Sequence, residues 1–255
     1  MNLTDTHTHL YLKEFENDLE QVLQRARNAG IAKFYMPAID STVIDDMLQL
    51  ETLYPQEVFP MMGLHPCSVK KNYLEELKIV EEYLSKRKFA AAGEIGLDFY
   101  WDVAFKEQQF QAFNKQMEMA LHHQMPIVIH TRNAMKETID TVRPFAAKGL
   151  RGIFHCFGDN YNTAKEITDI GFYLGIGGVL TYKNSKLAEA IKDIPLEYMV
   201  LETDAPYLSP VPYRGKRNES SYLPFIAQKL AEVKNVSLEE LAEITSSNAE
   251  KIFIH

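Results

Sequence analysis

The stretch Phe89-Ala-Ala-Ala-Gly-Glu-Ile-Gly-Leu97 is a short apolar run that carries one carboxylate, Glu94. Short apolar runs of this kind are typical of strands buried on both faces of a parallel sheet. A carboxylate inside such a run costs free energy unless it is paired or binds a metal ion. The stretch therefore predicts a buried strand with a functional carboxylate. A salt bridge to a lysine of the core is the alternative for Glu94 taken alone.

Seven further apolar runs, rich in Val, Ile, Phe or Ala, alternate with longer segments of helical spacing. The eight candidate strands cover residues 2–10, 32–38, 58–65, 89–97, 126–130, 152–157, 172–177 and 198–204. Alternating strands and helices predict a parallel sheet. Eight units in 255 residues favour an α/β fold of the closed (β/α)8 TIM-barrel type, with residues 1–255 as one domain. An open doubly wound sheet is the alternative, but no glycine-rich phosphate-binding motif follows the first run.

The segments between the runs carry apolar stripes that predict amphipathic helices. Two such stripes consist of Phe110, Phe113, Met117, Ala120 and Leu121, and of Tyr222, Phe225, Ile226, Leu230 and Val233. After the eighth unit, Ser237-Leu-Glu-Glu240 matches a capping box. We therefore expect an extra C-terminal helix over residues 237–252.

The composition excludes several classes of protein. Hydrophobic residues make up 46% and charged residues 24% of the chain, as in ordinary globular proteins. The net charge of -8 argues against bulk electrostatic binding of nucleic acid, so a polyanionic substrate would have to be held locally. Two distant cysteines form no disulfide framework, and neither a signal peptide nor a membrane-spanning run is evident. We expect a cytoplasmic protein with no membrane association and no obligate protein partner.

Polar residues with metal-binding side chains fall at the carboxyl ends of the predicted strands, where barrel active sites lie. Taken singly, each histidine is as well explained as a surface or hydrogen-bonded core residue, and the aspartate as a helix or turn cap. Together they form a stronger pattern, because four histidines and two carboxylates at one rim would repel or stay unsatisfied without cations. The predicted ligands are His7, His9, Glu94, His130, His155 and Asp204.

Imidazole and carboxylate ligands together suit Zn²⁺, Mn²⁺ and related divalent ions such as Mg²⁺. Six ligands exceed the three protein ligands that one catalytic zinc usually has. We therefore expect two divalent metal ions, about 3.5–4 Å apart and bridged by Glu94.

The sequence resembles the TatD family of metal-dependent deoxyribonucleases, which belongs to the amidohydrolase-like barrels. The matching stretches occur in order over nearly the whole chain: DTHTHL (5–10), GLHP (63–66), GEIGLDFYW (93–101), PIVIHTRNA (126–134), HCFG (155–158), GIGG (175–178), ETDAPYLSP (202–210) and RGKRN (214–218).

The resemblance implies one ion at His7, His9 and Glu94 with Asp204 beside it, and a second ion at Glu94, His130 and His155. It also implies hydrolysis of DNA phosphodiester bonds, of the 3′–5′ exonuclease type, by a metal-activated hydroxide.

The catalytic residues that we expect are Asp204 as base or proton shuttle and Glu202 as second choice or as an orienting residue. The expected substrate-binding residues are His65, Arg132, Tyr100, Arg214 and Arg217. Two alternatives stay open: Arg132 could pair with Asp98, and Tyr100 and Trp101 could pack the rim rather than stack on a base.

Two other functions compete with a DNA nuclease. The same bimetal site could serve a hydrolase of lactones, amides or phosphate esters. The negative net charge of the chain slightly favours this small-molecule hydrolase. The motif match and the basic stretch Arg214-Gly-Lys-Arg217 favour the nuclease. A non-catalytic barrel that binds nucleic acid or a protein is the least favoured, because every expected ligand is present.

Overall fold

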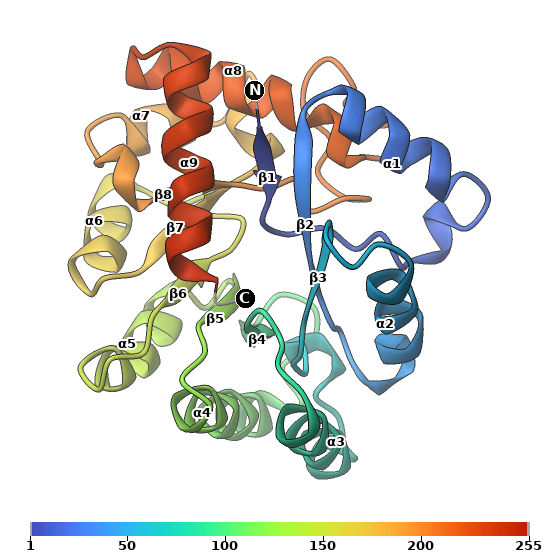
Figure 1. Cartoon of the computed structure of the whole chain (residues 1–255). Helices are drawn as coiled ribbons and strands as arrows, with labels where there is room; N and C mark the ends of the chain where they lie inside the picture. Colours follow the sequence, from blue (N-terminus) through green and yellow to red (C-terminus); the bar gives the residue numbers. More distant parts are fainter. Residues whose placement is uncertain (1, 254–255) are drawn as a thin grey trace.

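Parallel strands form a ring in the computed structural model, which describes residues 2–253 (Figure 1). Within that range there are eight strands: β1 (Leu3–Asp5), β2 (Ile31–Pro37), β3 (Val58–Met61), β4 (Ala92–Asp98), β5 (Ile127–Arg132), β6 (Gly152–Phe154), β7 (Tyr173–Ile176) and β8 (Met199–Leu201). They pair in chain order, β1-β2-β3 in one sheet and β4 to β8 in the other.

Hydrogen bonds at two junctions close the two sheets into a barrel. A parallel bridge between Met62 and Ala92 joins β3 to β4. Between β8 and β1, the backbone N–H of Thr6 donates to Leu201 O at 3.0 Å. The predicted (β/α)8 barrel is therefore confirmed, and the open doubly wound sheet is excluded.

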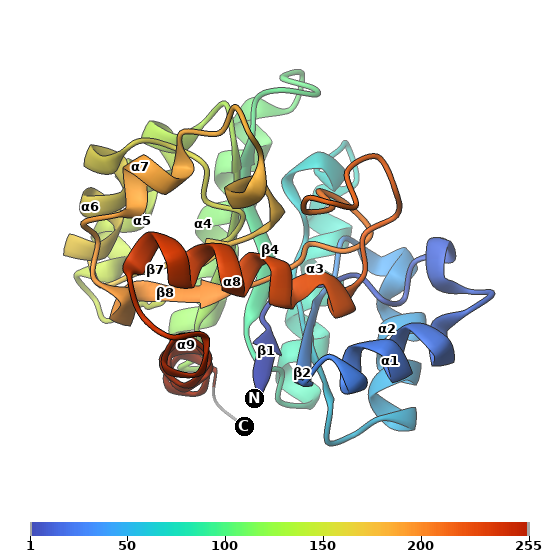
Figure 2. The same cartoon turned by 90° about the horizontal axis from the view of Figure 1, so that it is seen from above.

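Helices cover the outside of the ring, one after each strand (Figures 1 and 2). They are α1 (Leu19–Asn28), α2 (Ile44–Leu53), α3 (Tyr73–Lys86), α4 (Lys106–His122), α5 (Met135–Ala146), α6 (Tyr161–Asp169), α7 (Leu187–Ile191) and α8 (Leu223–Lys234). Short 3-10 turns join several of them to the strands: η1 (Lys13–Phe15), η2 (Ser41–Val43), η3 (Pro66–Ser68), η4 (Gly178–Thr181), η5 (Leu196–Tyr198) and η6 (Ser220–Tyr222).

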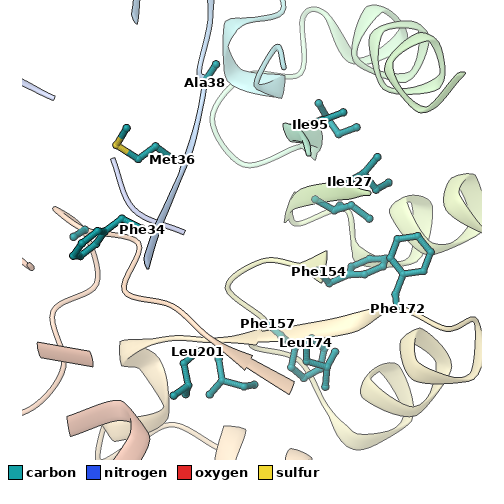
Figure 3. Close-up of a cluster of buried hydrophobic side chains, with 14 of the residues drawn as sticks. Phe34, Met36, Ala38, Ile95, Ile127, Phe154, Phe157, Phe172, Leu174 and Leu201 are labelled. Carbon is teal, nitrogen blue, oxygen red and sulfur yellow. The ribbon is translucent and has the colours of Figure 1, made fainter. Parts of the chain in front are cut away.

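Alternation along the strands builds two cores. Phe34, Ile127 and Phe154 face the helices and belong to the large core (Figure 3). Their neighbours Val128 and Ile153 point to the other side of the sheet and join a second, smaller core. Since successive side chains of a strand point to opposite faces, the apolar runs fill both the barrel interior and the layer beneath the helices.

The extra C-terminal helix α9 (Leu238–Ile252) closes one end of the barrel (Figure 1). Its last residues belong to the small interior core, and the Phe253 ring stacks on Tyr35 at 3.8 Å. The predicted N-cap is confirmed, because Ser237 Oγ accepts the Glu240 N–H at 3.1 Å. This end is opposite the carboxyl ends of the strands, so α9 leaves the predicted site side of the barrel free.

The predicted helical stripes are largely confirmed. On α4, Phe113, Met117 and Ala120 are buried, and on α8, Ile226 and Leu230 are buried. Phe225 is instead partly exposed and packs against Tyr213 at 5.4 Å.

Several strands end earlier than the apolar runs that predicted them. β1 stops at Asp5 and β8 at Leu201, so His7 and Asp204 lie beyond the regular strands. The two extensions still bond to each other, since the Asp204 N–H donates to His7 O at 2.9 Å. Both strands thus continue as paired but irregular backbone that carries polar side chains to one end of the barrel.

None of the helices between residues 2 and 253 is both long enough and apolar enough to span a membrane.

Candidate metal centre

The residues predicted to bind metal converge at the carboxyl ends of the strands. A cavity of about 700 Å³ lies there, lined in part by His9, His65, Glu94, His130, His155 and Asp204. His7 is fully buried beside it, with its ring stacked on His155 at 3.5 Å between centroids. Strands far apart in the sequence thus bring all six predicted ligands together.

Glu94 on β4 lies between two groups of histidines. Its Oε2 atom is 3.2 Å from His7 Nε2 and 3.9 Å from His9 Nε2. Its Oε1 atom is 2.9 Å from His130 Nδ1 and 3.6 Å from His155 Nε2. Because each carboxylate oxygen faces a different group, Glu94 has the orientation of a ligand shared between two cations.

Asp204 lies on the side of the first histidine pair. Its Oδ1 atom is 3.5 Å from His9 Nε2 and 3.8 Å from His7 Nε2, and 4.0 Å from His155 Nε2. The side chain is 13% exposed and lines the cavity, so Asp204 can reach both a cation and a molecule that enters from solvent.

Glu202 lies behind His155 rather than in the cavity. Its side chain is almost completely buried, and its Oε1 atom lies 2.9 Å from His155 Nδ1. The ring is turned so that this contact is an ion pair rather than a well-directed hydrogen bond. Gly175 provides the space, because a Cβ atom there would lie 2.3 Å from Glu202 Oε2. Glu202 therefore holds His155 with Nε2 directed at the site.

His9 and His130 are each oriented by a partner as well. Tyr11 donates its hydroxyl hydrogen to Pro37 O at 2.5 Å and lies 2.7 Å from His9 Nδ1, so His9 Nδ1 is the donor to Tyr11. His130 Nε2 lies 2.8 Å from Asp98 Oδ2. In the neutral tautomers that make these contacts, the second ring nitrogen carries a lone pair on the side of Glu94, where a metal ion could bind it.

The charge and burial of these side chains fit bound cations. Burial alone would raise the pKa of Glu94, but His7, His65 and His155 around it hold that pKa well below its usual value. Burial lowers the pKa of His7, and neither of its ring nitrogens has a hydrogen-bond partner among the described residues. A buried imidazole of this kind costs free energy unless a cation or proton satisfies it, so the residues present suit bound divalent metal.

His65 lies at the second group but has a different proton arrangement. Its Nδ1 atom accepts the Cys67 N–H at 3.0 Å, so in the neutral ring Nε2 carries the hydrogen. That Nε2 atom lies 3.2 Å from His130 Nδ1 and 3.6 Å from Glu94 Oε1. His65 is thus arranged as a hydrogen-bond donor into the cavity rather than as a metal ligand.

Arg132 and the aromatic residues after β4 form one stacked unit at the cavity. The Arg132 guanidinium lies 3.7 Å from the Tyr100 ring centroid and 5.1 Å from that of Trp101. Asp98 does not pair with Arg132, as one of our alternatives proposed, because its Oδ2 is bonded to His130 and its Oδ1 accepts the N–H groups of Tyr100 and Trp101.

The two arginines of the basic stretch after β8 lie outside the cavity lining. The Arg214 guanidinium stacks on Tyr182 at 3.7 Å. Arg217 makes two contacts of 2.7 Å to the carboxylate of Asp18. Arg217 therefore anchors its loop to the segment before α1, and its donors are engaged within the chain.

Sequence reasoning did not identify the orienting roles of Asp98 and Tyr11. A signal for both was present, because Asp98 has the strand parity of Glu94 and Tyr11 follows His9 by two residues. Such residues support metal ligands in many proteins, since a histidine ligand usually donates its second nitrogen to an acceptor.

Comparison with known proteins identifies the family. The model described as TatD related DNase matches residues 4–254. The chain is 35% identical to "Uncharacterized metal-dependent hydrolase YabD" of Bacillus subtilis (strain 168), over 98% of both chains. It is 32% identical to "Putative deoxyribonuclease TATDN3" of Mus musculus, over 99% of this chain and 88% of the other. The solved structure of YjjV, a TatD homologue from Escherichia coli K12, superposes with a TM-score of 0.93 at 28% identity, covering 98% of this chain and 97% of that one. The protein therefore belongs to the TatD family of metal-dependent hydrolases.

Proposed function

We propose that this protein is a two-metal deoxyribonuclease that hydrolyses phosphodiester bonds of DNA from the 3′ end. The observation that carries the proposal is the position of Glu94, whose two carboxylate oxygens face separate groups of histidines. The proposed ligands are those predicted from the sequence: His7, His9, Glu94, His130, His155 and Asp204.

Two divalent ions, Mg²⁺, Mn²⁺ or Zn²⁺, would acidify a water and offset the charge of the phosphate when bound. Asp204 is the proposed base, because it is the aspartate that lines the cavity and it accepts the proton that the attacking water loses. Glu202 is too deeply buried to meet that water, so its proposed role is to orient His155. After the P–O bond breaks, the same proton can pass from Asp204 to the departing 3′ oxygen.

The proposed phosphate contacts come from His65 and Arg132. His65 directs an Nε2–H donor into the cavity, and Arg132 offers the donors of a guanidinium that lies over the Tyr100 ring at 3.7 Å. Arg214, which stacks on Tyr182, is a proposed contact for a longer strand. We do not retain Arg217 among the contacts, because Asp18 already occupies its donors.

A DNA substrate is supported by the description of the matching family model and by the printed name of the mouse relative. The net charge of -8 is consistent with a substrate held by local contacts rather than by a broad basic surface. A cytoplasmic location and the lack of an obligate partner stay predictions.

The proposal is tested by activity on 3′-labelled single-stranded DNA with added Mg²⁺, Mn²⁺ or Zn²⁺, beside a panel of lactones, amides and phosphate monoesters. We expect stepwise loss of the 3′ label and slow turnover of the panel. Asp204→Asn should lower the DNA rate about 10²–10⁴-fold with metal content retained, since it removes the base. Asp169→Asn, at an exposed position at the end of α6, serves as the control. Faster hydrolysis of a lactone or monoester than of any DNA would replace the nuclease by the small-molecule hydrolase.

A further inference from the structure

The rim of the cavity carries an exposed aromatic surface that the proposed chemistry does not use. Trp101 is 68% exposed and Tyr100 is 51% exposed, although both rings are large and apolar. Trp101 is nevertheless one of the residues that line the cavity. Exposed aromatic side chains at the entrance to a site are a common feature of ligand-binding surfaces.

The loop that carries these rings is fixed to the metal centre. Asp98 Oδ1 accepts the Tyr100 N–H at 2.9 Å and the Trp101 N–H at 3.2 Å, while Oδ2 of the same carboxylate contacts His130. The Tyr100 and Trp101 rings meet edge to face, with centroids 4.8 Å apart. Their backbone position is therefore set by the residue that orients a proposed metal ligand.

Arg132 connects this surface to the proposed phosphate position. Its guanidinium covers the Tyr100 ring at 3.7 Å, which leaves Trp101 as the more exposed ring of the pair. Arg132 also lines the cavity and is two residues after His130. A phosphate at the metal centre would thus have both a cationic group and an exposed aromatic ring among the residues that line the cavity.

We propose that Trp101, supported by Tyr100 and Arg132, is the binding site for one unpaired nucleobase of the DNA strand next to the scissile phosphate. This inference rests on the proposed nuclease function and adds the residue that would hold the base. Stacking on an aromatic ring is tolerant of base identity, because every base offers a flat face. A base in a duplex is already stacked on its neighbours and has to leave the helix to reach Trp101.

Figure 2 is consistent with such access. The loop between β4 and α4 projects from the body of the barrel on the side away from α9, and the long loop after β8 projects on the same side (Figure 2). The second loop supplies Tyr207 and Leu208, both partly exposed, to the cavity lining. The two loops therefore bring aromatic and apolar side chains, as well as charge, to the lining of the cavity.

Trp101 is the only tryptophan of the chain, so its fluorescence reports directly on stacking. Three probes are compared: single-stranded tetrathymidylate, the same backbone with abasic sugars, and a blunt duplex of thymidylate and adenylate. Phosphorothioate linkages in the tetrathymidylate slow its hydrolysis. The protein is used as purified, with no chelator added. We expect the tetrathymidylate to quench the fluorescence and the abasic chain and the duplex to quench it little. Equal quenching by the abasic chain would overturn the proposal.

Variants test the same site by the anisotropy of dye-labelled probes. Trp101→Ala should weaken tetrathymidylate binding about tenfold, within the range seen when stacked aromatics are replaced by alanine, and leave abasic binding unchanged. Trp101→Phe should restore most of the affinity, and Val103→Ala, exposed on the same loop, is the matched control. Equal losses for both probes, or no loss, would overturn the base-binding site. Absence of nuclease activity with base-dependent binding intact would instead count against the proposed function alone.

Discussion

Replacement of Gly175 by alanine tests how the centre is assembled without touching a proposed ligand. A Cβ atom at this position of β7 would lie 2.3 Å from Glu202 Oε2 and 2.8 Å from Glu202 Cδ. Carbon and oxygen atoms in ordinary contact are about 3.4–4 Å apart. The Glu202 carboxylate therefore has to retreat by about 1 Å, and a contact of about 2.9 Å to His155 does not survive a shift of that size.

Two effects of opposite sign decide the stability of Gly175→Ala. At an unstrained position, a glycine-to-alanine change stabilises the folded protein by about 0.4–1 kcal/mol, because it reduces the conformational entropy of the unfolded chain. Overpacking of a buried site costs about 1–3 kcal/mol, so we expect a net loss of stability. Because His155 loses the residue that orients it, metal affinity should also fall about 10–100-fold.

Chemical denaturation of the metal-free protein and metal competition with a chelator measure these two effects separately. Gly177→Ala is a close control, since a Cβ atom there has its nearest neighbours 3.7–3.8 Å away, in ordinary contact. That variant should change stability by less than about 0.5 kcal/mol and leave metal affinity unchanged. A Gly175→Ala protein as stable as the wild type and with normal metal affinity would show that Glu202 does not orient His155 through this packing.

Three further predictions concern the same centre. Asp98→Asn keeps an acceptor for the N–H groups of the loop but presents an amide donor to His130 Nε2. Metal affinity, measured by competition with a chelator, should therefore fall about 10–100-fold. Unchanged metal affinity would remove Asp98 from the orienting role. Tyr11→Phe should lower metal affinity about tenfold by releasing His9, and it should cost about 1–3 kcal/mol of stability because His9 Nδ1 and Pro37 O lose their partner. Unchanged metal affinity would remove Tyr11 from the orienting role. In the metal-free protein, burial lowers the pKa of His155 but Glu202 and Glu94 outweigh it and raise that pKa to about 10, so the ring is protonated at neutral pH. A metal ion must displace this proton, so metal affinity should rise with pH below about 10. Calorimetry of metal binding in buffers of different ionisation enthalpy should show at least one proton released near pH 7. If no proton is released, His155 is not a metal ligand.

The barrel could be predicted from the sequence because its two signals are local. Each strand is an apolar run in which neighbours such as Phe154 and Ile153 serve opposite faces, and each helix has its own apolar stripe. Strand ends were less predictable. β1 and β8 stop where the two extensions bond to each other, for example between Asp204 and His7, and that pairing depends on residues nearly two hundred positions apart.

The proposed ligands were recognisable because barrel geometry gathers the carboxyl ends of the strands in one place. The supporting contacts were not, since they depend on side-chain direction rather than position in the chain. Arg217 shows the limit: its place in a basic stretch favoured a substrate contact, but the segment before α1 brings Asp18 to it. Asp98 is the opposite case, a residue whose role the sequence understated. It was considered only as a partner for Arg132, but its carboxylate instead joins His130 to the loop that carries Tyr100.

The most direct test is the number and position of metal ions in the purified protein. Elemental analysis together with anomalous scattering from crystals should find two divalent ions per chain, one beside each carboxylate oxygen of Glu94, and Glu94→Gln should lose at least one of them. A single ion with normal hydrolysis, or two ions bound away from Glu94, would contradict the shared-carboxylate centre on which the proposed chemistry depends.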